Sequence, residues 1–298
     1  MRPIHRFPVR HALKLGRFSP SKTPFLNTRT MATANSAEWS AAQYLKFEDK
    51  RTQPARDLLA RVPLQAPKTI VDLGCGPGNS TAVLVARYNQ PSAHVRGLDS
   101  SPDMIEKAKA ALPEVNFELQ DLTTYVPPEP VDLFFSNAVL QWLGHGERMD
   151  VMERLMRTQP SGGVFAFQVP DTLGQPSHIL MREVAAAGPW AQTLKDAGRE
   201  ALQTPQEIYD RLKVSSAGVC SEVEIFRTEY YHSLENHEAI IEWVKGTGLR
   251  PYIDPLSSQD REAFLREYLK ELQRAYPRTA DGRVLLRYPR LFVVAVRR

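Results

Sequence analysis

Short apolar runs alternate with amphipathic stretches along most of the chain, beginning near Trp39. Apolar runs bounded by turn residues are typical of buried strands, and apolar residues at every third or fourth position are typical of helices. In the first half, this pattern predicts helices over residues 40–61, 101–112 and 147–158, another helix opening near Asn79, and strands over 69–73, 95–98, 116–119, 131–136 and 164–169. Such alternation indicates a parallel sheet that is covered by helices on both faces.

The second half of the chain has a less regular pattern. It predicts helices over residues 177–187, 205–217, 237–245 and 257–275, interleaved with two long strands over 222–231 and 290–296. Two late strands that complete the sheet, with helices inserted between them, account for this order. We therefore predict a doubly wound, mostly parallel, seven-stranded α/β sheet of the Rossmann-like type. A single domain would span residues 38–298, with cap helices in about 38–62, 176–217 and 237–275.

The composition fits a globular α/β domain without a metal. At 298 residues and 42% hydrophobic content, the chain can bury a substantial core. No apolar run is long enough to cross a bilayer as a helix, so we expect no membrane-spanning segment. The two cysteines, Cys75 and Cys220, lie far apart, which excludes a disulfide framework or a cysteine-based zinc site and suits a reducing compartment.

The first 37 residues form a basic extension. They contain seven Lys or Arg residues and no Asp or Glu, and Arg2, Arg6, Arg10 and Lys14 recur at every fourth position. An Arg-rich, Ser-bearing segment without acidic residues is typical of a mitochondrial transit peptide, which predicts the mitochondrial matrix as the compartment. The alternatives are a disordered tail or translation from Met31, and both place the protein in the cytoplasm.

A glycine-rich loop follows the first strand. The strand runs directly into Gly74-x-Gly76-x-Gly78 and then a helix, which requires a sharp turn and leaves space for a ligand. A phosphate-binding P-loop would need Lys-Ser or Lys-Thr after the last glycine, where Asn79-Ser80 stands. A dinucleotide-binding G-x-G-x-x-G loop would place its third glycine at Asn79. The remaining candidates are an S-adenosylmethionine loop and a purely structural turn.

Acidic residues at the ends of the next two strands favour S-adenosylmethionine. Asp99 closes the second strand, where a carboxylate accepts from the ribose hydroxyls in related nucleotide-binding folds. Asp121 follows the third strand, where it can accept from the adenine amino group while Leu122 and Met104 cover the ring. Doubly wound folds bind ligands at this edge of the sheet. The predicted cofactor-binding residues are Asp72, Gly74, Gly76, Gly78, Asn79, Asp99, Ser100, Met104, Asp121, Leu122 and Asn137.

Two features argue against a nucleic-acid substrate. Residues 38–298 carry 31 basic and 34 acidic residues, a net charge of about −3, so the predicted domain is close to neutral. The segment from Asn137 to Trp142, after the fourth strand, reads Asn-Ala-Val-Leu-Gln-Trp. It lacks the Asn/Asp-Pro-Pro-Tyr/Phe motif by which methyltransferases acting on exocyclic amines of nucleic acids resemble one another.

Several blocks resemble one family, the trans-aconitate methyltransferases, which have the class I methyltransferase fold. The blocks are residues 39–47 with Arg51, Pro54 and Ala55, and residues 72–81, 97–102, 176–184, 228–232, 247–251 and 288–292. The last four blocks are far more selective than the cofactor motifs, and the resemblance covers residues 39–298. It implies an S-adenosylmethionine-dependent enzyme, which we expect to be a monomer, that forms a monomethyl ester of trans-aconitate or a similar small polycarboxylate.

The chemistry that the resemblance implies needs no general base. A carboxylate is already ionised at neutral pH, because its reference pKa lies near ~4, so it can attack the sulfonium methyl directly. The enzyme's contribution would be to align oxygen, methyl carbon and sulfur in a water-poor pocket. The planar fork of arginine is suited to hold the carboxylates that do not react.

Candidate substrate-binding residues lie in and near the family-like blocks. His178 and Arg182 are four residues apart and share a helix face. Arg250 follows a glycine-rich helix end, and Tyr230 and Tyr231 point to opposite sides of a strand, so at most one of the tyrosines faces the pocket. For each residue the alternative is an ion pair outside the pocket or a packed aromatic. The predicted substrate-binding residues are Arg250, Arg182, Arg290, His178, Tyr231 and Trp142.

Two other functions remain open from the sequence. One is carboxyl methylation of a malonyl thioester on a carrier protein. The other is a non-catalytic assembly factor that keeps the methyltransferase fold and binds a partner protein. The intact residues Gly74, Gly76, Gly78, Asp99 and Asp121 argue against a chain that has lost cofactor binding.

Overall fold

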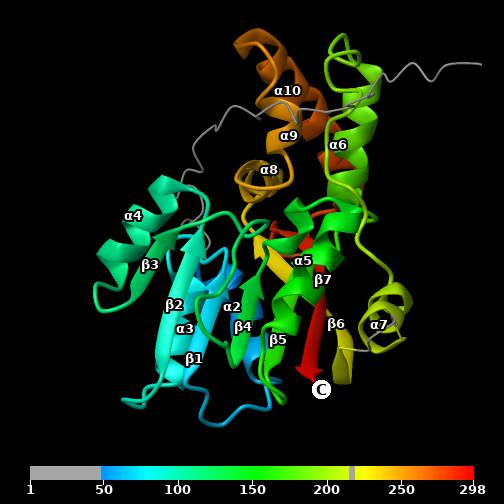
Figure 1. The fold of residues 1–298 in the computed structure, drawn as a ribbon. Coiled ribbons are helices and arrows are strands. Elements are labelled where there is room, and N and C mark those ends of the chain that lie inside the picture. Colours follow the sequence, from blue (N-terminus) through cyan, green and yellow to red (C-terminus); the bar gives the residue numbers. More distant parts are fainter. Residues whose placement is uncertain (1–47, 215–218) are drawn as a thin grey trace, which may run out of the picture. The chain divides into compact units, whose positions relative to one another are not determined.

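The structure is a computed structural model that describes residues 48–214 and 219–298 (Figure 1). The predicted transit peptide and the start of the first predicted helix lie outside these residues. The helices are α2 (Glu48–Leu59), α3 (Asn79–Arg87), α4 (Pro102–Ala111), the 3-10 turn η1 (Leu140–Trp142), α5 (His145–Arg157), α6 (Pro176–Ala187), α7 (Pro205–Val214), α8 (His237–Lys245), α9 (Arg250–Ile253) and α10 (Ser258–Ala275). The strands are β1 (Thr69–Leu73), β2 (His94–Asp99), β3 (Asn116–Leu119), β4 (Leu133–Asn137), β5 (Val164–Pro170), β6 (Cys220–Leu234) and β7 (Val284–Arg297).

The strands form one seven-stranded sheet in the order β3-β2-β1-β4-β5-β7-β6. The strands from β3 to β5 are parallel, whereas β7 runs antiparallel to both β5 and β6. Because β1 pairs with β2 on one side and with β4 on the other, the direction of the winding reverses between β1 and β4. Ligands of doubly wound sheets bind at the carboxyl ends of the strands beside such a reversal. The predicted fold class is confirmed.

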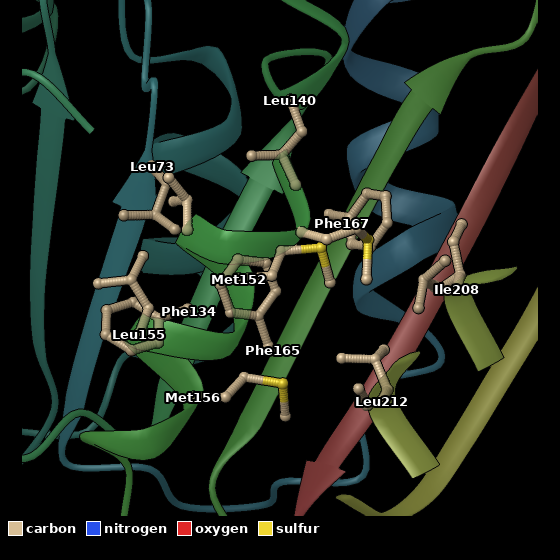
Figure 2. Packing of buried hydrophobic residues seen from close by; sticks show 14 of the residues in the cluster. Leu73, Phe134, Leu140, Met152, Leu155, Met156, Phe165, Phe167, Ile208 and Leu212 are labelled. Atoms are coloured by element: carbon tan, nitrogen blue, oxygen red, sulfur yellow. The ribbon is translucent and has the colours of Figure 1, made fainter. Parts of the chain in front are cut away.

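Apolar helix faces cover both sides of the sheet. On one side, Met152 of α5 and Leu212 of α7 belong to the same buried cluster as Phe134, Phe165 and Phe167 of the sheet (Figure 2). The opposite side is covered by α2 and α3, whose buried residues include Leu58 and Leu84. Burial of each large apolar side chain contributes about 1.5–3 kcal/mol, so these two layers hold the strand ends in fixed positions.

Helices α6, α8, α9 and α10 form a cap at the end of the sheet toward which the parallel strands point (Figure 1), whereas α4 packs beside β3. The cap has its own buried cluster, in which Trp190 packs against Phe264 with ring centroids 5.4 Å apart. The last residue of β5, Pro170, pairs with Arg290 of β7. Strands β6 and β7 continue beyond this point, and their extension contributes Leu286 and Tyr288 to the cap core. Arg290 therefore stands where the sheet meets the cap.

Two helices lie elsewhere than the predicted cap. Both α2 and α7 pack on the sheet, because their buried residues join the clusters under the two sheet faces and not the cluster of the cap. The sequence did not predict the short elements η1 and α9, because each spans about one turn, which is too short to show a helical repeat of apolar residues. Both late strands are longer than predicted: the ribbon that they extend into the cap alternates buried residues with exposed ones, among them Leu285 and Arg287. No helix among the described residues is long and apolar enough to span a membrane.

Candidate active site

The glycine loop (residues 74–78) leaves β1 in a conformation that favours glycine. Gly74, Gly76 and Gly78 all have positive φ, at 71°, 54° and 97°, which side chains other than glycine rarely adopt. A Cβ at Gly74 would lie 2.4 Å from a methyl group of Val139, whereas a Cβ at Gly76 would meet no atom within 4 Å. Gly74 is therefore required by packing against the segment after β4, and Gly76 borders open space that a ligand can occupy.

Asp72 lies in the interior beneath the loop. One carboxylate oxygen accepts hydrogen bonds from Ser80 Oγ at 2.7 Å and Thr81 Oγ1 at 2.6 Å. The other oxygen, Oδ1, is buried and has no hydrogen-bond partner among the described residues. Burial raises the pKa of Asp72 to about 6, against the lowering effect of the two hydroxyl donors. A carboxylate in this position creates a negative potential beneath the loop.

Asp99, at the end of β2, fixes the loop to the neighbouring strand. Its carboxylate accepts from the backbone N–H of Gly76 and of Ser101, both at 2.9 Å. Burial raises the pKa of Asp99 as well. Ser100 is exposed beside it, and Ser101 caps α4 by accepting from the N–H of Met104. Asp99 thus orders the loop and still presents its carboxylate at the edge where the sequence predicts the ribose.

The other predicted cofactor residues lie along the same edge of the sheet. Asp121 follows β3 and is exposed, with one oxygen accepting from both the backbone N–H and the Oγ1 of Thr123. Leu122 is half-buried, and Met104 is buried in the first turn of α4. Asn137 ends β4 and is 8% exposed. Their cofactor contacts stay predictions.

These residues suit S-adenosylmethionine. The cofactor carries an ammonium and a sulfonium charge, and two carboxylates flank the loop: Asp72 lies buried beneath it and Asp99 beside it, while there is room beside Gly76. When bound, the cofactor supplies an activated methyl group. Asp72, with an oxygen that no described residue satisfies, and Asp99 would favour its positive charges.

The raised pKa of Asp72 predicts a pH dependence of cofactor binding. The ionised carboxylate favours the cofactor's positive charge, so affinity is full above about pH 6 and falls as pH decreases through 6. We expect the Kd for S-adenosylmethionine to rise roughly three- to tenfold between pH 7.5 and pH 5, measured by calorimetry.

The matched variant is Asp72→Asn, which keeps an accepting oxygen for Ser80 and Thr81 but carries no charge. It should bind the cofactor more weakly at pH 7.5 and show a smaller change toward pH 5. Some dependence should remain, since burial also raises the pKa of Asp99. A wild-type Kd that stays constant over this range would contradict the role given to Asp72.

A second concave site, the arginine pocket, lies between the end of β4 and the cap. About 560 Å³ of space lies between and in front of its side chains, including open solvent, and about 50 Å³ of this is cavity volume. Three of the described residues around it are arginines, and none is an aspartate or glutamate. The described lining residues are Arg51, Ala138, Gln141, Trp142, Pro170, His178, Arg199, Trp243, Thr247, Gly248, Tyr288 and Arg290.

The three arginines reach the pocket from distant parts of the chain. Arg51 comes from α2 and donates to the carbonyl of Trp243 at 2.9 Å. Arg290 comes from β7 and donates to Gln168 Oε1 at 3.0 Å. Arg199 comes from the segment before α7; its Nη2 donates to the carbonyl of Pro170 and to Thr172 Oγ1, and its buried Nη1 has no hydrogen-bond partner among the described residues.

His178 forms a neutral part of the pocket wall. Burial, together with the charges of Arg199 and Arg182, lowers the pKa of His178 to about 3. Its two ring nitrogens lie 3.0 Å from Thr172 Oγ1 and 3.1 Å from Ser177 Oγ. A side chain at position 248 would meet the ring at 2.8 Å, so Gly248 lets the segment between α8 and α9 pack closely against His178 of α6. At neutral pH His178 is therefore an uncharged hydrogen-bonding group.

The segment after β4 joins the glycine loop to the arginine pocket. Ala138 has φ of 61°, a left-handed conformation that is uncommon for a residue with a side chain, and Gln141 Nε2 donates to its carbonyl at 2.6 Å. Ala138, Gln141 and Trp142 line the pocket, and Val139 packs against Gly74. One short segment thus contacts both sites.

A buried arginine, Arg148, fixes this segment to the chain that carries Arg199. It is 2% exposed and donates to the carbonyls of Leu140 and Leu143 at 2.8 Å and 2.9 Å, and to Gln203 Oε1 at 2.5 Å. Burial lowers the pKa of Arg148, but neutral acceptors surround its guanidinium. Arg148 therefore holds η1 and residues 201–203 together.

The structure brings half of the predicted substrate residues into the pocket. Arg290, His178 and Trp142 line it, and their contacts with a substrate stay predictions. Arg182 is exposed and donates to the carbonyl of Leu173 at 2.8 Å. Arg250 forms an ion pair with Asp254 at 3.2 Å, and neither arginine is among the lining residues.

Tyr231 also lies away from the pocket. It is 59% exposed and donates to Glu229, because strand alternation places it on the outer side of β6. Tyr230 points the other way and donates to Asp57 of α2, so neither tyrosine reaches the pocket. The aromatic residues that do line it include Trp243 and Tyr288, the latter being the pairing partner of Tyr230.

Arg51 and Arg199 also line the pocket, although the sequence predicted no role for either. Arg51 belongs to a family-like block, and that block was the available signal. Arg199 lies in a segment without periodicity, and no local pattern singles it out.

Comparisons with known proteins show which family the chain belongs to. A family model described as "Methyltransferase domain" matches residues 70–163. The chain is 50% identical over 262 residues to the trans-aconitate 2-methyltransferase of Rhizobium rhizogenes, covering 87% of this chain and 99% of that protein. It is 52% identical over 261 residues to the protein of the same name from Methylobacterium nodulans, covering 88% and 99%.

Solved structures agree in fold. The YcgJ protein of Bacillus subtilis gives a TM-score of 0.52 at 12% identity, covering 83% of this chain and 99% of that chain. The mycolic acid cyclopropane synthase CmaA1, solved with S-adenosylhomocysteine, gives a TM-score of 0.50 at 16% identity, covering 87% and 88%. The curated relatives confirm the resemblance of the sequence blocks. With about half of its residues identical to theirs over nearly their whole length, the chain belongs to the trans-aconitate 2-methyltransferase family of S-adenosylmethionine-dependent methyltransferases.

Proposed function

We propose that the protein transfers the methyl group of S-adenosylmethionine to a carboxylate of trans-aconitate and forms the 2-monomethyl ester. The observation that carries this proposal is the arginine pocket, in which three arginines and no acidic residue stand among the described lining residues. Such a wall suits a small polyanion. The names of the relatives supply the substrate and the position of the ester.

The pocket residues would bind and orient the acid. A carboxylate is ionised at neutral pH, so no group needs to remove a proton before the methyl transfer. His178 fits this scheme, because its pKa near 3 and its two hydrogen-bonded nitrogens leave it a neutral wall residue. The reaction would depend on alignment of the acid with the cofactor, and Ala138 and Gln141 lie where the two sites meet.

The arginines would hold the carboxylates that do not react. Arg199 Nη1 is a buried donor that no described residue satisfies, and a substrate carboxylate is a suitable acceptor for it. Arg51 and Arg290 are 5% and 4% exposed, so a carboxylate beside them is shielded from water and attracted more strongly than at the surface.

The test is methylation by the purified protein with labelled S-adenosylmethionine and a panel of acids. The panel contains trans-aconitate, cis-aconitate, citrate, a dicarboxylate and a malonyl thioester. We expect label to enter the trans-aconitate ester, and mass spectrometry with NMR of the product should place it at the 2-position. No ester on trans-aconitate, with cofactor binding intact, would overturn the proposal.

We also propose that the basic residues 1–37, which lie outside the described residues, direct the chain to the mitochondrial matrix. The support is their charge pattern, seven Lys or Arg residues without an acidic one. A fluorescent fusion of residues 1–37 should enter mitochondria. A fusion that stays in the cytosol would favour the alternative, a cytoplasmic enzyme.

A further inference from the structure

A row of hydrogen-bonded side chains crosses three neighbouring strands at the edge of the active site. Asn137 ends β4, Gln168 faces it on β5, and Arg290 lies on β7. Gln168 donates from Nε2 to Asn137 Oδ1 at 2.5 Å and accepts from Arg290 Nη1 at 3.0 Å. Gln168 is fully buried, and the side chains at both ends of the row are nearly so. The row therefore links the predicted cofactor residue Asn137 to the arginine pocket.

The chemistry of arginine sets the direction of this row. A guanidinium only donates hydrogen bonds, so the oxygen of the Gln168 amide must face Arg290. The amide nitrogen of Gln168 then faces Asn137 and requires the Asn137 oxygen as its acceptor. As a consequence, the amide nitrogen of Asn137 points away from Gln168.

We propose that Gln168 is a positioning residue of the substrate site, which holds the Arg290 guanidinium with a neutral acceptor, so that this contact orients the positive charge of Arg290 without competing with a substrate carboxylate for it. The inference rests on the proposed function. It assigns to Gln168 a role in substrate affinity although the residue does not line the arginine pocket.

The side chain of Gln168 is uncharged, which distinguishes it from a carboxylate at the same position. A carboxylate at this position would attract the guanidinium strongly, since both groups are buried and opposite charges interact more strongly where water is excluded. Such a pair would compete directly with the substrate for Arg290. The other two pocket arginines also donate to uncharged acceptors among the described residues: the Trp243 carbonyl for Arg51, and the Pro170 carbonyl and Thr172 hydroxyl for Arg199.

The decisive variant is Gln168→Glu, which keeps the shape of the side chain. The glutamate can accept from Arg290 at one oxygen and, after rotation of the Asn137 amide, from Asn137 at the other. We expect the KM for trans-aconitate to rise about 10- to 100-fold, which corresponds to the loss of one charged hydrogen bond. The Kd for S-adenosylhomocysteine should rise less, because rotation of the Asn137 amide alters only one predicted cofactor contact. A merely structural glutamine would instead change both constants equally or change neither.

A second variant, Gln168→Met, keeps the volume and removes the acceptor without adding a charge. Arg290 then keeps its charge but loses the acceptor at position 168, so we expect a smaller rise in KM than in Gln168→Glu. Melting temperatures of both variants show whether they fold. If Gln168→Glu fails to fold, Gln168→Met alone decides, and a wild-type KM in that variant would overturn the inference.

Binding of trans-aconitate to the protein saturated with S-adenosylhomocysteine, measured by calorimetry, separates the two proposals. Wild-type protein that binds the acid but does not methylate it would overturn the proposed function alone. Folded Gln168→Glu protein that binds the acid as tightly as wild type does would overturn the role of Gln168 alone. We expect wild type to bind and methylate the acid, and Gln168→Glu to bind it about 10- to 100-fold more weakly.

Discussion

Replacement of Arg199 by Met is expected to lower kcat/KM for trans-aconitate about 100-fold, mainly through KM. Arg199 Nη2 is held by Pro170 and Thr172, while the buried Nη1 has no hydrogen-bond partner among the described residues and belongs to a pocket-lining side chain. A charged hydrogen bond contributes about 1.5–3 kcal/mol, so the loss of one bond together with the charge yields an effect of this size. Steady-state kinetics with trans-aconitate and S-adenosylmethionine measure it.

The matched control is Arg182→Met. It removes the same charge from an exposed arginine of α6 that lies outside the pocket lining, so kcat/KM should stay within about twofold of wild type. Arg199→Lys should recover part of the activity, since lysine keeps the charge but not the fork. Equal losses in Arg199→Met and Arg182→Met would show that the effect is long-range electrostatics and not contact with the acid. If Arg199→Met raised the Kd for the cofactor as much as the KM for trans-aconitate, Arg199 would not be specific to the acid.

The cofactor side of the site could be predicted from the sequence because it is encoded locally. Most of its residues stand at the end of a strand or in the turn that follows, and β1 and β3 end where the apolar pattern ends. The parallel topology then brings these ends to one edge without further information. Gly74, Gly76 and Asp99 could therefore be found by their distance from a strand end alone.

The arginine pocket was predicted only in part because its residues converge through tertiary structure. Arg51, Arg199 and Arg290 lie on α2, on an irregular segment and on β7, and no local period relates them. The position of Arg199 depends on Arg148, which attaches the following residues to η1. A buried arginine of this kind looks like any surface position in an amphipathic helix.

Helix geometry explains why Arg182 was assigned to the pocket. A helix turns about 100° per residue, so positions four apart differ by about 40°. The buried arc of α6 runs through His178, Met181 and Val184, and Arg182 falls just beyond its edge. A spacing of four residues therefore indicates neighbouring positions, but the width of the buried arc decides which of them face the interior.

The glycine loop allows folding and cofactor binding to be separated by two single substitutions. In Gly74→Ala the new Cβ would lie 2.4 Å from Val139 at a φ of 71°, so strain and overpacking should destabilise the fold by about 3 kcal/mol and lower Tm by roughly 5–10 °C. In Gly76→Ala the new Cβ meets nothing within 4 Å, and the positive φ alone should cost about 1 kcal/mol. The two variants therefore differ in stability although they lie two residues apart.

The order should be reversed for cofactor affinity, which we expect Gly76→Ala to weaken more than Gly74→Ala does. The space beside Gly76 is open in the protein, so if it belongs to the cofactor, Gly76→Ala should fold nearly normally and bind S-adenosylhomocysteine about 100-fold more weakly. Gly146→Ala is the control, because its Cβ also meets nothing within 4 Å but the residue lies in α5, away from the loop. Differential scanning fluorimetry without cofactor and calorimetry with it measure both quantities. A Gly76→Ala protein with wild-type affinity would indicate that the cofactor binds elsewhere along the edge of the sheet. A Gly74→Ala protein with wild-type Tm would show that Val139 moves to make room for the new methyl group.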